Sequence, residues 1–559
     1  MNRLTVPSLA LLTVVVAGCS AQSERPAAAA HQQHGTSAEA GTAPPLFDNL
    51  GRYSQRITTS SPQAQAYFDQ GLRLVYGFNH WEAQRAFREA VRLDPSCAMC
   101  YWGVAFTYGS NYNSPTDTDR ERGAYEAVQG ARALAERVTP RERAMIDELV
   151  TRHSATPTPD RAALDRAYAD AMREVTRQFP NDPDAATLFA DALMNLRPWN
   201  LWTEDGKPQP GTEEIVRTLE RVLAASPSHP GANHLYIHAV EASPNPDRAV
   251  PAADRLGALM PGAGHMVHMP SHIYFRVGRY AEATDVNVKA AAVDRAFFTR
   301  SQPSPTYRMM YYPHNLDFVW HSASMEGRNA ETVRAARDFA KEAPTEMARE
   351  MSDMETAPAA PMFALVRFGR WEEALAQPAP PAGLPYVAGA WRYTRGFAYA
   401  ATGRFDDAER ELTELRAITQ GVAPARTLGG FFKTKDILAL AEDVLAGEIA
   451  GRRGDPATAA RHLAAAAGAQ DTHWFMEPPV WYFPIRHSLG AVLLQAGRAP
   501  EAEIVYREDL RRNPENGWAL FGLAQSLRAQ GKADEAAAVE ARFATAWARA
   551  DVKITASRF

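Results

Sequence analysis

Histidines gather in one central stretch of this chain. Of its 15 histidines in 559 residues, seven fall between positions 233 and 322: His234, His238, His265, His268, His272, His314 and His321. On a helix, side chains four residues apart lie about 5–6 Å from each other, so His234 and His238 can present two ring nitrogens to one ion. The same holds for His268 and His272. Because imidazole suits copper, zinc, iron and nickel, this spacing predicts a transition-metal site.

Acidic residues and methionines accompany the histidines. Glu241 and Asp317 are expected either to ligate the metal or to hold an imidazole in one orientation by accepting its hydrogen bond. Thioether sulfur would favour copper, although methionines on helices more often fill a core. The methionines in question are Met266, Met269, Met309 and Met310. We therefore expect copper, zinc or iron as the cofactor.

Familiar catalytic motifs do not occur in the sequence. There is no H-E-x-x-H zincin motif, since residue 235 is Leu, and no glycine-rich phosphate loop or nucleophile elbow. A metal held by three or four histidines with one open position would still activate water. The sequence therefore leaves open whether the site is catalytic.

The elements that must position these residues are predicted by a recurring pattern of small and large side chains. Its first unit comprises Tyr67, Gly71, Leu74, Ala83, Phe87, Ala90 and Pro95. The small residues let two antiparallel helices approach, the large ones fill the space around them, and the proline ends the second helix. Later units are marked by Gly396, Gly447, Gly490 and Trp518.

This pattern resembles that of tetratricopeptide repeat (TPR) proteins over most of residues 60–545. The resemblance implies an all-α fold, a TPR-like α-solenoid in which helix hairpins stack into a right-handed superhelix, here with insertions. In that family, certain places on the first helix of each hairpin face the ligand groove. With units starting at Pro230, Gly264 and Pro313, all seven histidines, with Glu241 and Asp317, fall on groove-facing places. We therefore expect three successive hairpins to bring these imidazoles together.

The N-terminal residues predict export. An apolar run from Leu4 to Val16 is too short to span a bilayer and ends in Val16-Ala17-Gly18-Cys19. This ending resembles the lipobox of bacterial lipoproteins, and an ordinary secretory signal is the alternative. The resemblance implies a cleaved signal peptide (1–18) and a lipid on Cys19. Since Ser20 follows, it also implies an outer-membrane location facing the periplasm.

The rest of the chain divides by composition and repeat pattern. Residues 19–46 carry almost no bulky apolar side chain and are expected to form a flexible tether. Three regions of repeats follow: N-terminal repeats with an insertion (47–200), central histidine-rich repeats (201–345) and C-terminal repeats (346–559). Lys and Arg number 60 against 65 Asp and Glu, with no basic tract, so nucleic acid is not expected as a partner.

Besides Cys19, the sequence contains two cysteines, Cys97 and Cys100. In an oxidising compartment, a close pair is expected to form a disulfide, and two small buried thiols are the alternative. A redox or metal-binding role is the third interpretation, but a thioredoxin-like motif requires a strand–loop–helix context that this sequence lacks.

These observations support three functional hypotheses. The first is a lipid-anchored solenoid whose groove binds a transition metal through the histidines. The second is a scaffold that binds an envelope protein or peptide without metal, since the fold alone favours partner binding. The third is a metal-free groove that responds to pH, because clustered histidines titrate near neutrality.

Overall fold

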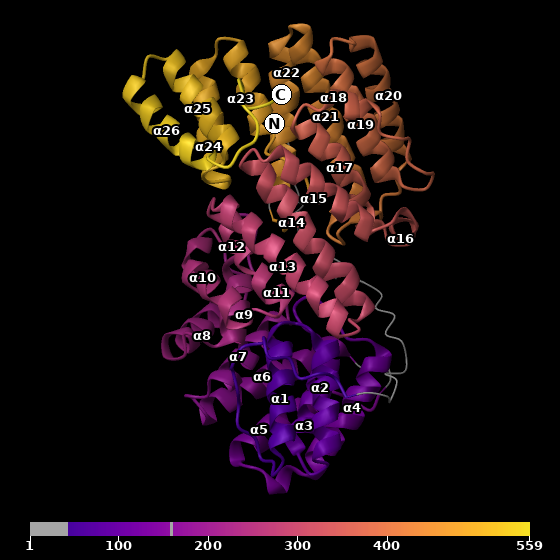
Figure 1. Cartoon of the computed structure of the whole chain (residues 1–559), viewed down its shortest axis with the longest axis vertical. Coiled ribbons are helices and arrows are strands. Elements are labelled where there is room, and N and C mark those ends of the chain that lie inside the picture. Colours follow the sequence, from indigo (N-terminus) through magenta and orange to yellow (C-terminus); the bar gives the residue numbers. More distant parts are fainter. Residues whose placement is uncertain (1–42, 157–159, 474) are drawn as a thin grey trace, which may run out of the picture.

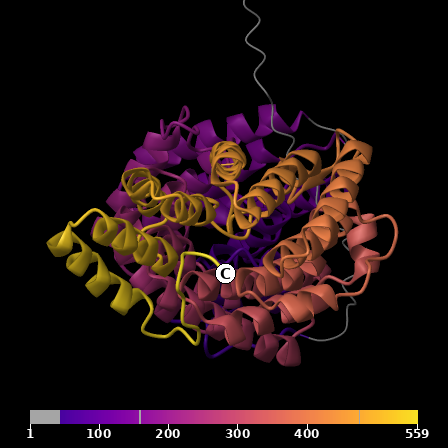
Figure 2. The same cartoon turned by 90° about the horizontal axis from the view of Figure 1, so that it is seen from above.

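The computed structural model describes residues 43–156, 160–473 and 475–559. Most of these residues form helices, and the expected all-α solenoid of stacked helix hairpins is confirmed. The helices climb along the long axis of the molecule from the N-terminal to the C-terminal end, and viewed along that axis the C-terminal helices curve round in an arc (Figures 1 and 2). The predicted signal peptide, Cys19 and residues 19–42 of the predicted tether lie outside the described residues. The last tether residues contact α1, where Tyr67 and Gln70 donate hydrogen bonds to the carbonyl oxygens of Pro44 and Pro45.

The N-terminal helices form one end of the molecule (Figure 1). They are α1 (Pro62–Tyr76), α2 (His80–Leu93), α3 (Ala98–Tyr108), α4 (Thr118–Ala133), η1 (Ala135–Arg137), α5 (Pro140–Arg152), α6 (Arg161–Gln178), α7 (Pro183–Met194) and α8 (Thr212–Ala225).

The central helices contain the histidine-rich stretch. They are α9 (Pro230–Val240), η2 (Pro246–Ala249), α10 (Val250–Leu259), α11 (Gly264–His268), α12 (Pro270–Arg276), α13 (Tyr280–Arg300), the π-helical turn η3 (Tyr307–Tyr311), α14 (Tyr312–Met325) and α15 (Asn329–Glu342).

The C-terminal helices form the other end of the molecule. They are α16 (Thr345–Glu350), η4 (Ser352–Glu355), α17 (Thr356–Arg367), α18 (Trp371–Leu375), α19 (Pro385–Ala401), α20 (Phe405–Gly421), α21 (Thr434–Arg453), α22 (Pro456–Thr472), α23 (Arg486–Gln495), α24 (Ala499–Arg512), α25 (Gly517–Ala529) and α26 (Ala533–Ala546). A short antiparallel pair, β1 (Thr427–Leu428) with β2 (Phe432–Lys433), precedes α21.

The first hairpin shows how the repeat pattern specifies the packing. Ser61 caps α1 by accepting a hydrogen bond from the backbone N–H of Ala64. A Cβ built at Gly71 would lie 2.6 Å from the ring of Phe87 on α2, so only glycine allows the two helices to approach this closely. A disulfide joins Cys97 and Cys100 at the start of α3.

The buried hydrophobic residues of the described chain form two large clusters. One includes residues from Phe47 to Ala283, and the other includes residues from Ala291 to Val539. They meet on α13, which contributes Ala283 to the first cluster and Ala291 to the second. Helices α9, α11 and α12 pack with the first cluster, whereas α14 packs with the second. The histidine-bearing helices therefore lie at the junction of the two cores.

Across the part of the chain that the structure describes, none of the helices is both long enough and apolar enough to cross a membrane.

Candidate metal centre

Four helices supply the histidines at this junction. His234 and His238 lie on α9, His265 and His268 on α11, His272 on α12 and His314 on α14. The first helix of the middle hairpin is interrupted between α11 and α12, because Pro270 has no N–H to donate to the preceding turn. The backbone N–H of His272 bonds to Met269 O instead.

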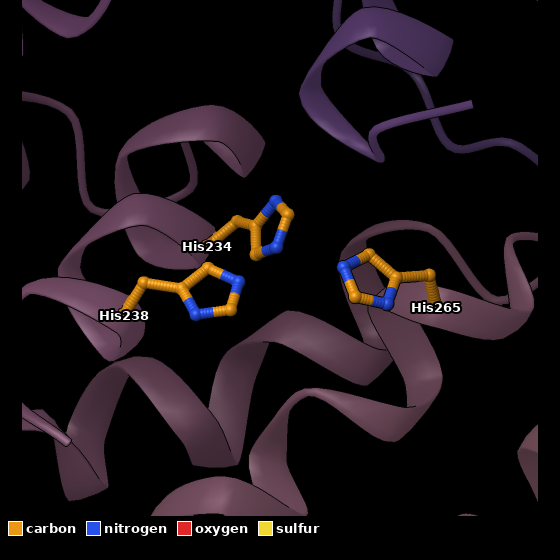
Figure 3. A group of neighbouring side chains, drawn as sticks. All are labelled: His234, His238 and His265. Carbon is orange, nitrogen blue, oxygen red and sulfur yellow. The ribbon is translucent and has the colours of Figure 1, made fainter. Parts of the chain in front are cut away.

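His234, His238 and His265 form the first set of imidazoles (Figure 3). One ring nitrogen from each lies within 4.8 Å of the others, and all three residues are buried. The ring centroids of His234 and His238 are 5.0 Å apart, and those of His234 and His265 are 4.9 Å apart. This geometry matches the expected pairing of positions four apart on α9 with a histidine of the next hairpin.

His268, His272 and His314 form the second set. Their ligand atoms also lie within 4.8 Å of one another. Nε2 of His268 is 2.8 Å from Nε2 of His272, and the ring centroids of His268 and His314 are 4.8 Å apart. Together, these two sets are called the histidine cluster below.

Backbone and amide acceptors fix the protonated nitrogen on one ring of each set. Nδ1 of His234 donates to the carbonyl oxygen of Tyr76 at 2.6 Å, since a carbonyl only accepts. Nδ1 of His268 donates to Oδ1 of Asn287 at 2.6 Å, because the Asn287 amide nitrogen is engaged with the carbonyl of Ala283. A neutral imidazole carries one proton, so Nε2 of His234 and Nε2 of His268 each present a lone pair to the cluster.

One carboxyl group contacts both sets. Oε1 of Glu241 lies 3.0 Å from Nδ1 of His238, and its Oε2 lies 2.7 Å from Nδ1 of His272. Glu241 is almost fully buried at the C-terminal end of α9. It therefore holds the outer nitrogens of two rings and directs their Nε2 atoms towards the other histidines.

Several inner nitrogens lack a hydrogen-bond partner among the described residues. They are Nε2 of His234, Nε2 of His238 and both ring nitrogens of His265. Buried polar atoms are normally paired, and an unpaired one costs about 1–3 kcal/mol. Several such atoms facing one small space are typical of a site built for a ligand that accepts lone pairs.

Burial holds the imidazoles in their neutral form. It lowers the pKa of His234, His238, His265 and His268 well below the usual range, and neighbouring imidazoles lower it further. The pKa of His314 falls to about 3 for the same reasons, burial first and then His272. Neutral imidazole is the form that coordinates metal.

A second acidic residue comes from far away in the sequence. Glu477 lies between α22 and α23, and its carboxyl group contacts Nδ1 of His272. Burial raises the pKa of Glu477 to about 8 and also raises the pKa of Glu241, which the nearby Glu477 raises further. No helical spacing links Glu477 to the histidines. The one sequence signal is an acidic side chain within a run of aromatic residues and prolines.

The cluster opens onto a cavity of about 1110 Å³. His238 and His265 of the first set and His272 and His314 of the second set line it, whereas His234 and His268 lie behind them. Aromatic side chains form much of the remaining wall, among them Tyr112, Trp199, Tyr311, Phe431 and Tyr482. Small molecules can therefore reach both sets from one space.

His321 and Asp317 lie apart from the cluster. His321 lines the same cavity, but its Nδ1 lies 3.1 Å from Oδ1 of Asp317, and its ring packs on Trp320. Seven residues along α14 from His314 amount to a rise of about 10 Å, too far to share an ion. Six of the seven predicted histidines are thus brought together, with Glu241 beside them.

Comparison with known proteins identifies the repeat. The family model described as Tetratricopeptide repeat matches residues 390–413 and 517–539. The first match falls on α19 and α20, and the second falls on α25 and α26. Both coincide with repeat units marked by sequence pattern, at Gly396 and Trp518. No curated protein matches the chain.

Solved structures that match the chain do so with low sequence identity and low TM-scores. A human IFIT1 dimer with m7Gppp-AAAA is 14% identical, with a TM-score of 0.29, over 88% of this chain and 91% of that one. The Cut9–Hcn1 hetero-tetramer of APC/C is 13% identical, with a TM-score of 0.30, over 83% and 76%. The TPR domain of P58(IPK) is 10% identical, with a TM-score of 0.22, over 84% and 99%. At these values, the likeness supports no statement about ligands.

Proposed function

Since the chain is a tetratricopeptide repeat protein, we propose that its central hairpins bind a transition metal through the histidine cluster. The observation that carries the proposal is the set of buried imidazole nitrogens of His234, His238 and His265 that have no hydrogen-bond partner. A cation accepts these lone pairs and thereby offsets the cost of leaving them unpaired.

The surroundings of the cluster resemble the second layer of a metal site. Metal-bound histidines usually donate their other ring N–H to a carboxylate or a carbonyl oxygen, which fixes the ring. Here, the carbonyl of Tyr76 and the side chains of Asn287 and Glu241 contact outer nitrogens in this way. Copper, zinc and iron all suit such a donor set.

Metal analysis of purified protein tests this proposal. We expect the mature chain to bind copper or zinc near stoichiometrically after dialysis. H234A/H238A should bind less metal while keeping the helical circular dichroism of the unmodified chain. His462 is the matched control, because it pairs with Asp443 on the C-terminal helices, away from the cluster. Absence of metal uptake by a folded, unmodified chain would refute the proposal.

The cavity supports a second candidate function. Its volume of about 1110 Å³ exceeds what one ion needs and reaches the upper end of small-molecule sites. A peptide or a segment of an envelope protein seated against the aromatic wall would make the solenoid a binding scaffold. If a partner is found and it binds the chelated protein and H234A/H238A unchanged, the scaffold function holds without metal.

We also propose that the chain is anchored in the cell envelope by lipid on Cys19 and faces the periplasm. The lipobox-like ending at Cys19 supports this proposal. Expression of C19A in a bacterial host should abolish labelling with radioactive palmitate and move the protein from the membrane fraction to the soluble fraction. Unchanged labelling of C19A would exclude this anchor.

A further inference from the structure

We infer that the histidine cluster holds two metal ions side by side, one in each set of three imidazoles. The inference rests on the proposed function, because the cluster can hold two ions only if it binds metal. It adds the number of ions, their ligands and the space that they share.

Metal–ligand distances divide the histidine cluster into two sets of three residues. Zinc binds imidazole nitrogen at about 2.0–2.1 Å in tetrahedral geometry, so the ligand atoms on one ion lie about 3.3–3.4 Å apart. Groups within 4.8 Å of one another contain three histidines each: His234, His238 and His265, and separately His268, His272 and His314. Each set binds its own ion once its most widely separated ligand atoms move closer by up to about 1.4 Å.

Each set supplies the three protein ligands that a catalytic metal ion typically has. Three protein ligands with one open position are typical of catalytic zinc sites, whereas structural sites are closed by four. In the first set, Nε2 of His234 and Nε2 of His238 converge with a ring of His265 that has no other polar partner. In the second set, Nε2 of His268 already lies 2.8 Å from Nε2 of His272.

The sets are adjacent rather than independent. Ring centroids of His238 and His272 are 5.6 Å apart, and those of His265 and His268 are 5.8 Å apart. Glu241 contacts Nδ1 of His238 with one oxygen and Nδ1 of His272 with the other. One carboxyl group thus orients a ring in each set and fixes their separation, as expected for a pair of ions that act together.

Both sets reach the same cavity. His238 and His265 line it for the first set, and His272 and His314 line it for the second. The open positions of the two ions would therefore face one space. In known two-metal sites, the ions lie about 3.5–4 Å apart and stabilise both oxygens of a reacting group. The ligand class that fits is a small oxygen donor that bridges the ions.

A competing arrangement uses one ion. His238, Glu241 and His272 also form a group within 4.8 Å, with the carboxylate as a ligand. That arrangement consumes the Nδ1 atoms and leaves the Nε2 atoms of His234 and His238 unpaired. It predicts one ion per chain and complete loss of metal when Glu241 is changed to Gln.

Metal stoichiometry separates these cases. The full chain would be loaded with Zn²⁺ or Cu²⁺, dialysed and analysed for metal per protein. We expect two ions for the unmodified chain and one ion for each of H234A/H238A and H268A/H314A. E241Q should keep both ions with weaker affinity. Circular dichroism and thermal unfolding show whether each variant is folded.

The outcomes distinguish the two proposals. One ion per unmodified chain would overturn the two-ion inference and leave the metal-binding function standing. Removal of all metal by either folded double variant would also overturn it, since the sets would then share one ion. No metal in the unmodified chain would refute both.

Discussion

Nε2 of His268 lies 2.8 Å from Nε2 of His272, one turn apart across the break between α11 and α12. Asn287 holds the proton of His268 on the opposite nitrogen. The short contact therefore depends on a proton that His272 donates or on a cation that both rings share. The two nitrogens already lie close enough to bind one ion, so metal binding requires little movement of these two rings.

Asn287 should control the affinity of the site without touching the ion. N287A removes the acceptor that orients His268, and such changes next to metal ligands typically weaken affinity by about 10–100-fold. Competition with a chromophoric chelator measures the Kd. N287D keeps an oxygen in the same place and should restore most of the affinity. Equal Kd values for N287A and the unmodified chain would show that the orientation of His268 does not matter.

Gly264 should be irreplaceable at the start of α11. A Cβ there would lie 1.9 Å from Oδ1 of Asp294, so G264A must displace either the helix that carries His265 or the Asp294 carboxyl group, which accepts hydrogen bonds from Tyr307 and Asn315. We expect a loss of about 1–3 kcal/mol in the free energy of unfolding, measured with urea, together with weaker metal binding. G468A is the matched control, because nothing lies within 4 Å of a Cβ at that helical position. Equal stability of the two variants would contradict this packing.

Asp191 should make stability fall as the pH rises. Burial raises the pKa of Asp191 from 3.8 to about 6, with Arg152 and a hydrogen bond from Asn195 opposing the shift. The folded state thus favours the protonated acid. The stabilising contribution of the protonated Asp191 carboxyl group is complete below pH 4. It is lost as the pH rises through 6, which lowers the free energy of unfolding by about 3 kcal/mol in total.

The variant D191N removes this dependence. Urea unfolding at pH 4 and at pH 7 should show the variant gaining stability relative to the unmodified chain at the higher pH. A difference between the two proteins that stays constant with pH would contradict the shifted pKa.

The disulfide should contribute modestly to stability. Cys97 and Cys100 close a loop of only four residues, which corresponds to about 2 kcal/mol from the restricted unfolded chain. C97S/C100S keeps a hydroxyl at position 97 to replace the sulfur that caps α3. We expect it to unfold at lower urea concentration but to bind metal normally. Reaction of both cysteines of the unmodified protein with a thiol reagent under native, oxidising conditions would contradict the disulfide.

The fold was predictable because its determinants are local. Gly71 and Phe87 lie within one hairpin, and their spacing alone specifies a close helix pair. The pairs His234/His238 and His268/His272 follow from helical periodicity in the same way. Local patterns of this kind require no knowledge of distant residues.

The rest of the site depends on contacts between distant segments. The carbonyl of Tyr76, which orients His234, comes from α1, 158 positions earlier. Glu477 reaches His272 from the other core, and a loop without periodicity carries it. His321 fits the same helical register as His314, yet the length of α14 separates the two. Sequence spacing identifies a face of a helix but not which residues on that face share a partner.

Anomalous diffraction from crystals of the metal-loaded chain tests the central claim most directly. Data collected at the absorption edge of the bound metal should give density between Nε2 of His234, Nε2 of His238 and the ring of His265, and a second peak beside His268, His272 and His314. An anomalous map that lacks density at both sets, from a folded chain soaked in excess metal, would contradict the account.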